Sequence, residues 1–122
     1  MTAAPSLKPV IWVGSSRKDL REFPDPVQDH LGYALYVAQC GGKHRDAKVL
    51  TGFGGAGVVE IVKDHRGDTF RAVYTLRHAG AVYVLHVFQK KSKSGRATPR
   101  REMELIKQRV REAEQIAKEM KP

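Results

Sequence analysis

Four ionisable side chains, those of Glu60, Arg71, His86 and Lys90, are expected on one face of a three-stranded meander. Opposite residues of neighbouring antiparallel strands have Cβ atoms about 5 Å apart, and diagonal ones lie about 7–8 Å apart. A glutamate or histidine there can move a proton, and an arginine or lysine can neutralise charge on a phosphate. These residue types, next to the apolar Phe88, predict acid–base chemistry on a phosphate group.

Each of these residues also has an ordinary structural interpretation. Glu60 and Arg71 can form a cross-strand ion pair worth less than about 1 kcal/mol. His86 can be a hydrogen-bonded, partly buried histidine, and Lys90 can end its strand in water. We favour a functional cluster because the four ionisable groups share one mixed face.

Positive charge is concentrated in the second half of the chain. The sequence has 22 Lys and Arg against 13 Asp and Glu, and its net charge is +9. Residues 1–61 carry 7 basic and 6 acidic side chains, whereas residues 62–122 carry 15 and 7. This balance predicts a polyanionic partner such as RNA for the second half, with a solvated basic surface as the alternative. The expected RNA-binding residues are Arg77, Lys93, Arg96, Arg100 and Arg101.

The composition excludes several other classes of protein. A single cysteine, Cys40, can form neither an internal disulfide nor a multi-cysteine zinc site. The five histidines lack the spacing of metal ligands, so no metal and no other cofactor is expected. No apolar run reaches the roughly 18–20 residues of a membrane span, and the N-terminus lacks a signal-peptide pattern. We therefore expect a cytoplasmic protein without membrane contact.

The glycine-rich residues 52–57 match the spacing of a dinucleotide-binding motif, but strand-like sequence follows them. Such a motif needs a helix after it, so a flexible loop that enters a strand is the better interpretation.

The 122 residues are expected to form one domain, with residues 1–7 as a disordered tail. The meander strands are expected at about 57–63, 68–77 and 82–90. A first loop at 64–67 places Glu60 opposite Arg71, and a second turn that pairs Arg77 with Val82 places Arg71 opposite Phe88.

Alternation along these strands gives the sheet two faces. One face is apolar throughout and is predicted to be the core: Val59, Ile61, Phe70, Ala72, Tyr74, Leu76, Tyr83, Leu85 and Val87. The other face is mixed and is predicted to line a half-open surface: Val58, Glu60, Val62, Arg71, Val73, Thr75, Arg77, Val82, Val84, His86, Phe88 and Lys90.

Helices are expected on both sides of the meander in the sequence. A strand at 8–13 precedes a short helix and then a longer one, with Asp25 as its N-cap and Pro26 as its first residue. These two helices are expected to form a hairpin. Thr98 and Pro99 are expected as the N-cap and first residue of a C-terminal helix. Its apolar seam packs on the protein's own core or on a partner: Met103, Ile106, Val110, Ala113, Ala117 and Met120.

The motifs Phe70-Arg71-Ala72-Val73-Tyr74 and Leu85-His86-Val87-Phe88-Gln89-Lys90-Lys91, followed by Thr98-Pro99, resemble the RelE/HigB-type toxins and their phage-derived-toxin-like branch. The resemblance covers about residues 8–113. It implies an α+β fold, with an N-terminal helical hairpin packed on a small antiparallel sheet and a C-terminal helix.

The same resemblance implies the toxin of a type II toxin–antitoxin system. Such toxins are metal-independent endoribonucleases that cut mRNA, usually on the ribosome, by activating the ribose 2′-hydroxyl. The implied partners are a cognate antitoxin, encoded by an adjacent gene as a helix-turn-helix protein, together with mRNA and the ribosome. Operator DNA is reached only through the antitoxin.

The resemblance also assigns roles to individual residues. Arg71 matches the strand arginine that contacts the phosphate, His86 matches the preceding histidine, and Lys90 and Lys91 match the paired lysines. The fifth catalytic candidate, Glu60, matches the acidic residue of a Glu-Leu-Arg motif. Here the motif reads Glu60-Ile61-Val62, so Val62 replaces the family arginine, and no tyrosine follows Tyr83.

Three other functions remain open from the sequence. The chain can be a non-catalytic RNA-binding module, which explains the charge equally well. It can be an inactive toxin homologue that acts through its antitoxin. It can also be an interaction protein whose C-terminal seam binds a partner helix.

Overall fold

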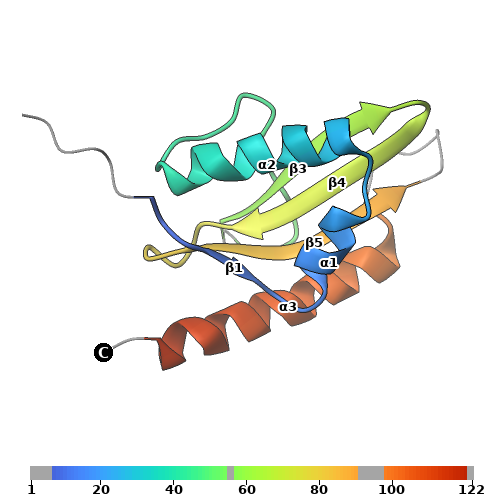
Figure 1. Cartoon of the computed structure of the whole chain (residues 1–122). Helices are drawn as coiled ribbons and strands as arrows, with labels where there is room; N and C mark the ends of the chain where they lie inside the picture. Colours follow the sequence, from blue (N-terminus) through green and yellow to red (C-terminus); the bar gives the residue numbers. More distant parts are fainter. Residues whose placement is uncertain (1–6, 55–56, 91–97, 121–122) are drawn as a thin grey trace, which may run out of the picture.

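A five-stranded sheet and three helices make up the computed structural model, which describes residues 7–54, 57–90 and 98–120 (Figure 1). Along the chain the elements are β1 (Val10–Trp12), α1 (Ser16–Arg21), α2 (Asp25–Gln39), β2 (Lys48–Val49), β3 (Val58–His65), β4 (Asp68–Thr75), β5 (Val82–Lys90) and α3 (Arg100–Glu119). The strand order is β1-β5-β4-β3-β2. The predicted α+β class is confirmed.

The sheet lies between helices that cover its two faces. Figure 1 shows α2 on one face and α3 on the opposite face, with α1 beside β5. The sheet is antiparallel except at one edge, where β1 runs parallel to β5. Residues 1–6 of the expected tail lie outside the described part of the chain, and just after the tail the N–H of Lys8 donates to the Gln39 carbonyl. No described helix combines the length and apolar character needed to cross a bilayer.

Both faces of the sheet are buried, so the expectation of one half-open face is wrong. The cluster under α2 holds Leu31, Ile61, Ala72 and Tyr74, among others. A second cluster under α3 is built around Ile106, which is 0% exposed. The apolar seam of α3 therefore packs on the protein's own sheet. A strand buried on both faces loses clear alternation, and accordingly every residue of β5 from position 82 to 88 is buried.

An irregularity in β5 moves four residues, at positions 82–85, to the face opposite the expected one. Val73 pairs with His86 but Tyr74 pairs with Val84, so Leu85 is an extra residue in the strand. Such a bulge shifts the alternation by one position. Tyr83 and Leu85 consequently pack under α3 rather than in the core under α2. Val82 and Val84 take their places in the α2 core.

The first hairpin is two residues tighter than expected. His65 pairs with Asp68, which leaves Arg66 and Gly67 as the turn, with φ of 51° and 86°. Two positive φ values are the mark of a two-residue turn that matches strand twist. As a result Glu60 pairs with Val73, not with Arg71. A shift of two residues keeps every side chain on its face, so Glu60 and Arg71 remain diagonal neighbours.

Both long helices begin one residue from the expected position. Pro24 occupies the N-cap position of α2, and Pro99 occupies that of α3. Asp25 is therefore the first residue of α2 rather than its cap. Thr98 precedes the cap of α3, and its hydroxyl forms hydrogen bonds with Arg71 and Glu60 instead of capping the helix.

Ionisation of a buried tyrosine is expected to destabilise the fold at high pH. Burial raises the pKa of Tyr74 to about 12. A tyrosine in the unfolded chain loses its proton near pH 10. The contribution of neutral Tyr74 to the free energy of unfolding is therefore fully present below pH 10 and is lost as the pH rises towards 12. Two pKa units correspond to about 2–3 kcal/mol. Tyr74→Phe should therefore flatten the fall in unfolding free energy between pH 10 and 12, whereas Tyr33→Phe, at an exposed position, should leave it unchanged.

Candidate active site

Arg71 lies at the centre of a buried hydrogen-bonded group on the α3 face of the sheet. Its Nη1 donates to Glu60 Oε2 at 3.0 Å and to Thr98 Oγ1 at 3.3 Å. The Thr98 hydroxyl in turn donates to the same Glu60 oxygen at 3.1 Å. The side chains of Arg71 and Glu60 are 5% and 13% exposed. This triangle joins β3 and β4 to the residue just before α3, and so fixes where that helix begins.

His86 does not join that triangle but forms a second group with α3. Its Nε2 lies 2.8 Å from Glu102 Oε2, and its Nδ1 lies 3.3 Å from Arg109 Nη1. An arginine N–H can only donate, so the arrangement makes Nδ1 the acceptor and leaves the ring proton on Nε2, directed at Glu102. The ring also stacks on Phe88, with centroids 4.9 Å apart.

The bulge in β5 brings Leu85 to the α3 face beside His86, which keeps its expected pairing opposite Val73. Leu85 and His86 both face the helix, and Arg109 donates to the Leu85 carbonyl at 3.0 Å. Arg109 also approaches Gly14, where a Cβ atom would lie 2.7 Å from its Cζ. Gly14 has a φ of 58°, so it supplies both the backbone conformation and the space that this arginine needs.

A pocket of about 490 Å³ opens beside His86 and Glu102. The end of β5 contributes Lys90 to its wall, and the first turn of α3 contributes Arg101. Asp19 of α1 is the second acidic group in the lining. The side chain of Glu102 is 20% exposed, against 8% for His86. The carboxylate is thus the more accessible member of the pair, with two cations beside it.

This arrangement is suited to proton transfer next to an anion. A carboxylate that accepts a hydrogen bond from a fixed imidazole is held in one orientation, as acid–base catalysis requires. Lysine and arginine side chains at the same wall can bind a phosphate. The described geometry therefore combines a proton acceptor and phosphate-binding cations in one pocket.

The structure separates the residues that the sequence grouped together. His86 and Lys90 line the pocket, whereas the buried Arg71 and the partly buried Glu60 lie in their own triangle. Lys91, Lys93 and Arg96 lie outside the described residues.

Three of the arginines that were expected to bind RNA lie within the described residues. Arg100 and Arg101 are exposed in the first turn of α3. Arg77 instead forms a 3.0 Å ion pair with Glu114. Glu114 follows Glu102 by twelve residues, which is about 18 Å along a helix. Arg77 therefore lies away from the pocket.

Sequence reasoning did not assign Glu102, Arg109 or Thr98 to the site. Glu102 and Arg109 are seven residues apart on α3, and so occupy the same face two turns from each other. Two charged residues at this spacing, beside the apolar seam of the helix, were the sequence signal that could have indicated both as site residues. What they contact depends on how α3 lies across the sheet, for which the sequence offers no local mark.

Comparison with known proteins gives one family. A family model described as "Phage derived protein Gp49-like (DUF891)" matches residues 18–111. No curated protein matches the chain. Among solved structures, the chain is similar to the toxin–antitoxin complex RelBE2 from Mycobacterium tuberculosis, with 18% sequence identity and a TM-score of 0.48. That match covers 75% of this chain and 100% of the other.

Proposed function

Because the chain belongs to the Gp49-like family of phage-derived proteins, a family of RelE-type toxins, we propose that it is a metal-independent endoribonuclease. The observation that carries this proposal is the pocket in which Glu102 and His86 form a 2.8 Å pair beside Lys90 and Arg101. RNA supplies both groups that such a pocket can act on, a ribose hydroxyl and a neighbouring phosphate.

In the proposed reaction the Glu102 carboxylate takes the proton from the ribose 2′-hydroxyl. The 2′-oxygen then attacks the adjacent phosphorus, and the bond from phosphorus to the 5′-oxygen breaks. His86 holds the carboxylate in place through its Nε2–H. The ammonium group of Lys90 gives a proton to the departing 5′-oxygen. The products are a 2′,3′-cyclic phosphate and a 5′-hydroxyl, with no metal involved.

Charge on the phosphate increases during this attack, and cations placed in advance stabilise it. Lys90 and Arg101 line the pocket and have this role in our proposal. Arg71 is 4% exposed and holds Glu60 and Thr98. We therefore assign Arg71 and Glu60 to positioning the start of α3, and hence Glu102 and Arg101, rather than to contacting the scissile phosphate.

The cellular role that we propose follows from the family. The chain would act as the toxin of a type II pair, cutting mRNA at the ribosome in the cytoplasm and thereby stopping translation. A cognate antitoxin would inhibit it and bring it to operator DNA. An adjacent reading frame for a helix-turn-helix protein, whose co-expression restores growth, is the expected genetic evidence.

The test of activity is cleavage of a defined RNA by the purified chain, with and without ribosomes and in the presence of EDTA. We expect fragments ending in a 2′,3′-cyclic phosphate, and EDTA should not prevent them. RNA that is bound but left intact in every condition would favour the non-catalytic RNA-binding module.

Lys90 and Arg101 are expected to set the salt dependence of RNA binding. Log affinity falls as log salt rises, and each lost contact to a phosphate of single-stranded RNA should make this negative slope less steep by about 0.7. Lys90→Ala and Arg101→Ala should each show this decrease in a fluorescence anisotropy titration at several salt concentrations. Arg77→Ala is the matched control, since Arg77 pairs with Glu114 away from the pocket. Equal slopes for all three variants would exclude the pocket as the phosphate site.

A further inference from the structure

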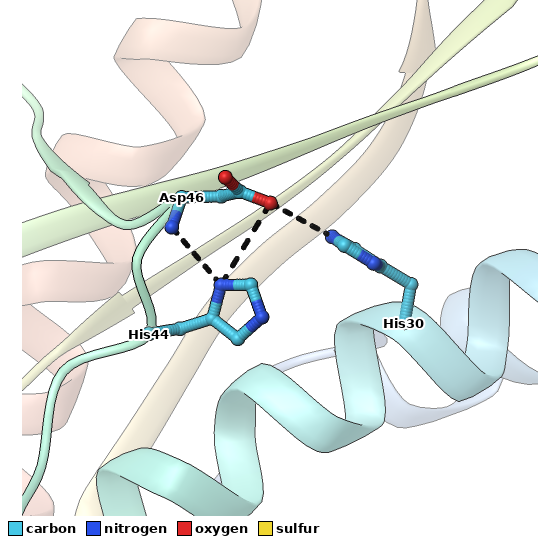
Figure 2. A group of neighbouring side chains, drawn as sticks. All are labelled: His30, His44 and Asp46. Carbon is cyan, nitrogen blue, oxygen red and sulfur yellow. Dashed lines mark hydrogen bonds and ion pairs between the residues drawn. The ribbon is translucent and has the colours of Figure 1, made fainter.

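Two histidines and an aspartate meet on the opposite side of the sheet from the pocket. His30 belongs to α2, whereas His44 and Asp46 belong to the loop between α2 and β2. Figure 2 shows the Asp46 carboxylate between the two imidazoles. One ligand atom from each residue lies within 4.8 Å of the others. Their spacing of 14 and 2 residues in the sequence did not suggest a metal site, because only the fold brings them together.

The distances from the Asp46 carboxylate to the two imidazoles exceed those of hydrogen bonds. Asp46 Oδ2 lies 3.6 Å from His30 Nε2 and 3.9 Å from His44 Nδ1. Two ligand atoms that share a tetrahedral zinc ion at about 2.0–2.2 Å are about 3.3–3.6 Å apart. The first distance fits such an ion as it stands, and the second needs a movement of a few tenths of an ångström. The three ligand atoms together lie within 4.8 Å of one another, so the two histidines must also move closer when the ion binds.

His30 supplies an independent observation. Its Nε2 is buried and has no hydrogen-bond partner among the described residues. A buried polar atom without a partner is costly, so it requires an explanation.

We propose that His30, His44 and Asp46 bind one divalent cation of the zinc type. Two imidazoles and one carboxylate are a donor set that suits zinc, whereas magnesium and calcium prefer oxygen ligands alone. The Asp46 side chain is 44% exposed, so water can complete the coordination from the solvent side. The bound ion would fasten the loop before β2 to α2, on the opposite face of the sheet from the RNA pocket.

Two features oppose binding and have to be overcome. The Asp46 N–H donates to His44 Nδ1 at 3.0 Å, so the ion either replaces this hydrogen bond or uses Nε2 after rotation of the ring. Arg45 Nε lies 3.9 Å from the other Asp46 oxygen and competes for the carboxylate. Zinc binds imidazole strongly enough to displace one hydrogen bond and one exposed ion-pair contact, which is a further reason to expect zinc rather than a hard cation.

The experiment is a titration of the untagged full chain with zinc, followed by calorimetry, and with cobalt, followed by visible absorption. One ion per chain should bind, and cobalt should give the intense bands of a four-coordinate site. Removal of an outer partner of a metal ligand costs about 10–100-fold in affinity. His30→Ala, His44→Ala and Asp46→Asn remove ligands themselves, so each should weaken binding by at least about that factor.

Matched controls separate this site from adventitious binding. His65→Ala removes a histidine from the end of β3, and Cys40→Ser removes an exposed thiol that could bind zinc by itself. Both controls should bind as the parent does. Asp46→Asn is the decisive variant, because its exposed position makes unfolding improbable and thermal melting without metal verifies the fold. Affinity unchanged in Asp46→Asn, or lost in Cys40→Ser, would overturn the proposal. No step involves RNA, so the result is independent of the ribonuclease proposal.

Discussion

Glu102→Gln should lower the rate of RNA cleavage by about 10²–10⁴-fold, the usual contribution of a general base. Glutamine has the shape of glutamate, and its amide oxygen can still accept the hydrogen bond from His86. It cannot take a proton from the ribose hydroxyl. Cells that express this variant without an antitoxin should therefore keep growing, while the melting temperature of the purified protein should stay close to that of the parent.

Glu104→Gln is the control for this experiment. Glu104 lies two residues further along α3 with a side chain that is 62% exposed, near Lys107 rather than the pocket. The Glu104→Gln variant loses one negative charge, as Glu102→Gln does, but no group of the pocket changes. Its RNA cleavage should therefore continue at the parental rate. A Glu102→Gln protein that still cleaves RNA would reduce the pair with His86 to a contact that fastens α3 to the sheet.

The elements of the fold could be predicted because each has a local cause. Runs of β-branched and aromatic residues bounded by turn residues mark β4 and β5, and the apolar spacing of α3 marks a helix with one buried face. The parallel partner of β1 and the two-residue strand β2 could not be predicted. The pairing of both depends on distant segments, and β2 has no pattern of its own long enough to identify it.

Prediction of the site was limited by register. Arg71 was correctly placed on the face of Glu60, since a shift of two residues preserves faces. His86 was also placed on the correct face, but its partners Glu102 and Arg109 depend on how α3 lies across the sheet, which no strand register gives. The group of His30, His44 and Asp46 illustrates the same limit, because no spacing rule connects a helix residue to the loop that folds back on it.

Arg71→Ala should destabilise the fold by about 3–5 kcal/mol, the usual result of leaving one partner of a buried ion pair alone. The Glu60 carboxylate would lose its 3.0 Å partner while staying only 13% exposed. For a chain of this length, the melting temperature should fall by roughly 10–20 °C. Urea and thermal unfolding of the purified variant measure both quantities.

The pair formed by Arg77 and Glu114 is a natural control. It has the same residue types and the same 3.0 Å distance, but its side chains are 50% and 37% exposed. Such a pair is worth less than about 1 kcal/mol, so Arg77→Ala should melt close to the parent. A comparison of the stability lost in Arg71→Ala and in Arg77→Ala therefore measures the effect of burial on an arginine–glutamate pair of the same length.

Replacement of both partners distinguishes a purely stabilising role for Arg71 from a role in the reaction. The double variant Glu60→Gln/Arg71→Met leaves no unpaired charge in the sheet, so it should regain most of the stability that Arg71→Ala loses. Cleavage that recovers together with stability would limit Arg71 to stabilising the fold. A stable double variant that does not cleave RNA would show that Arg71 acts in the reaction, either by positioning the start of α3, as we propose, or by contacting the phosphate. A guanidinium so deeply buried could do so only if α3 moved away from the sheet when RNA binds, because Thr98 and Glu60 cover it in the structure described here.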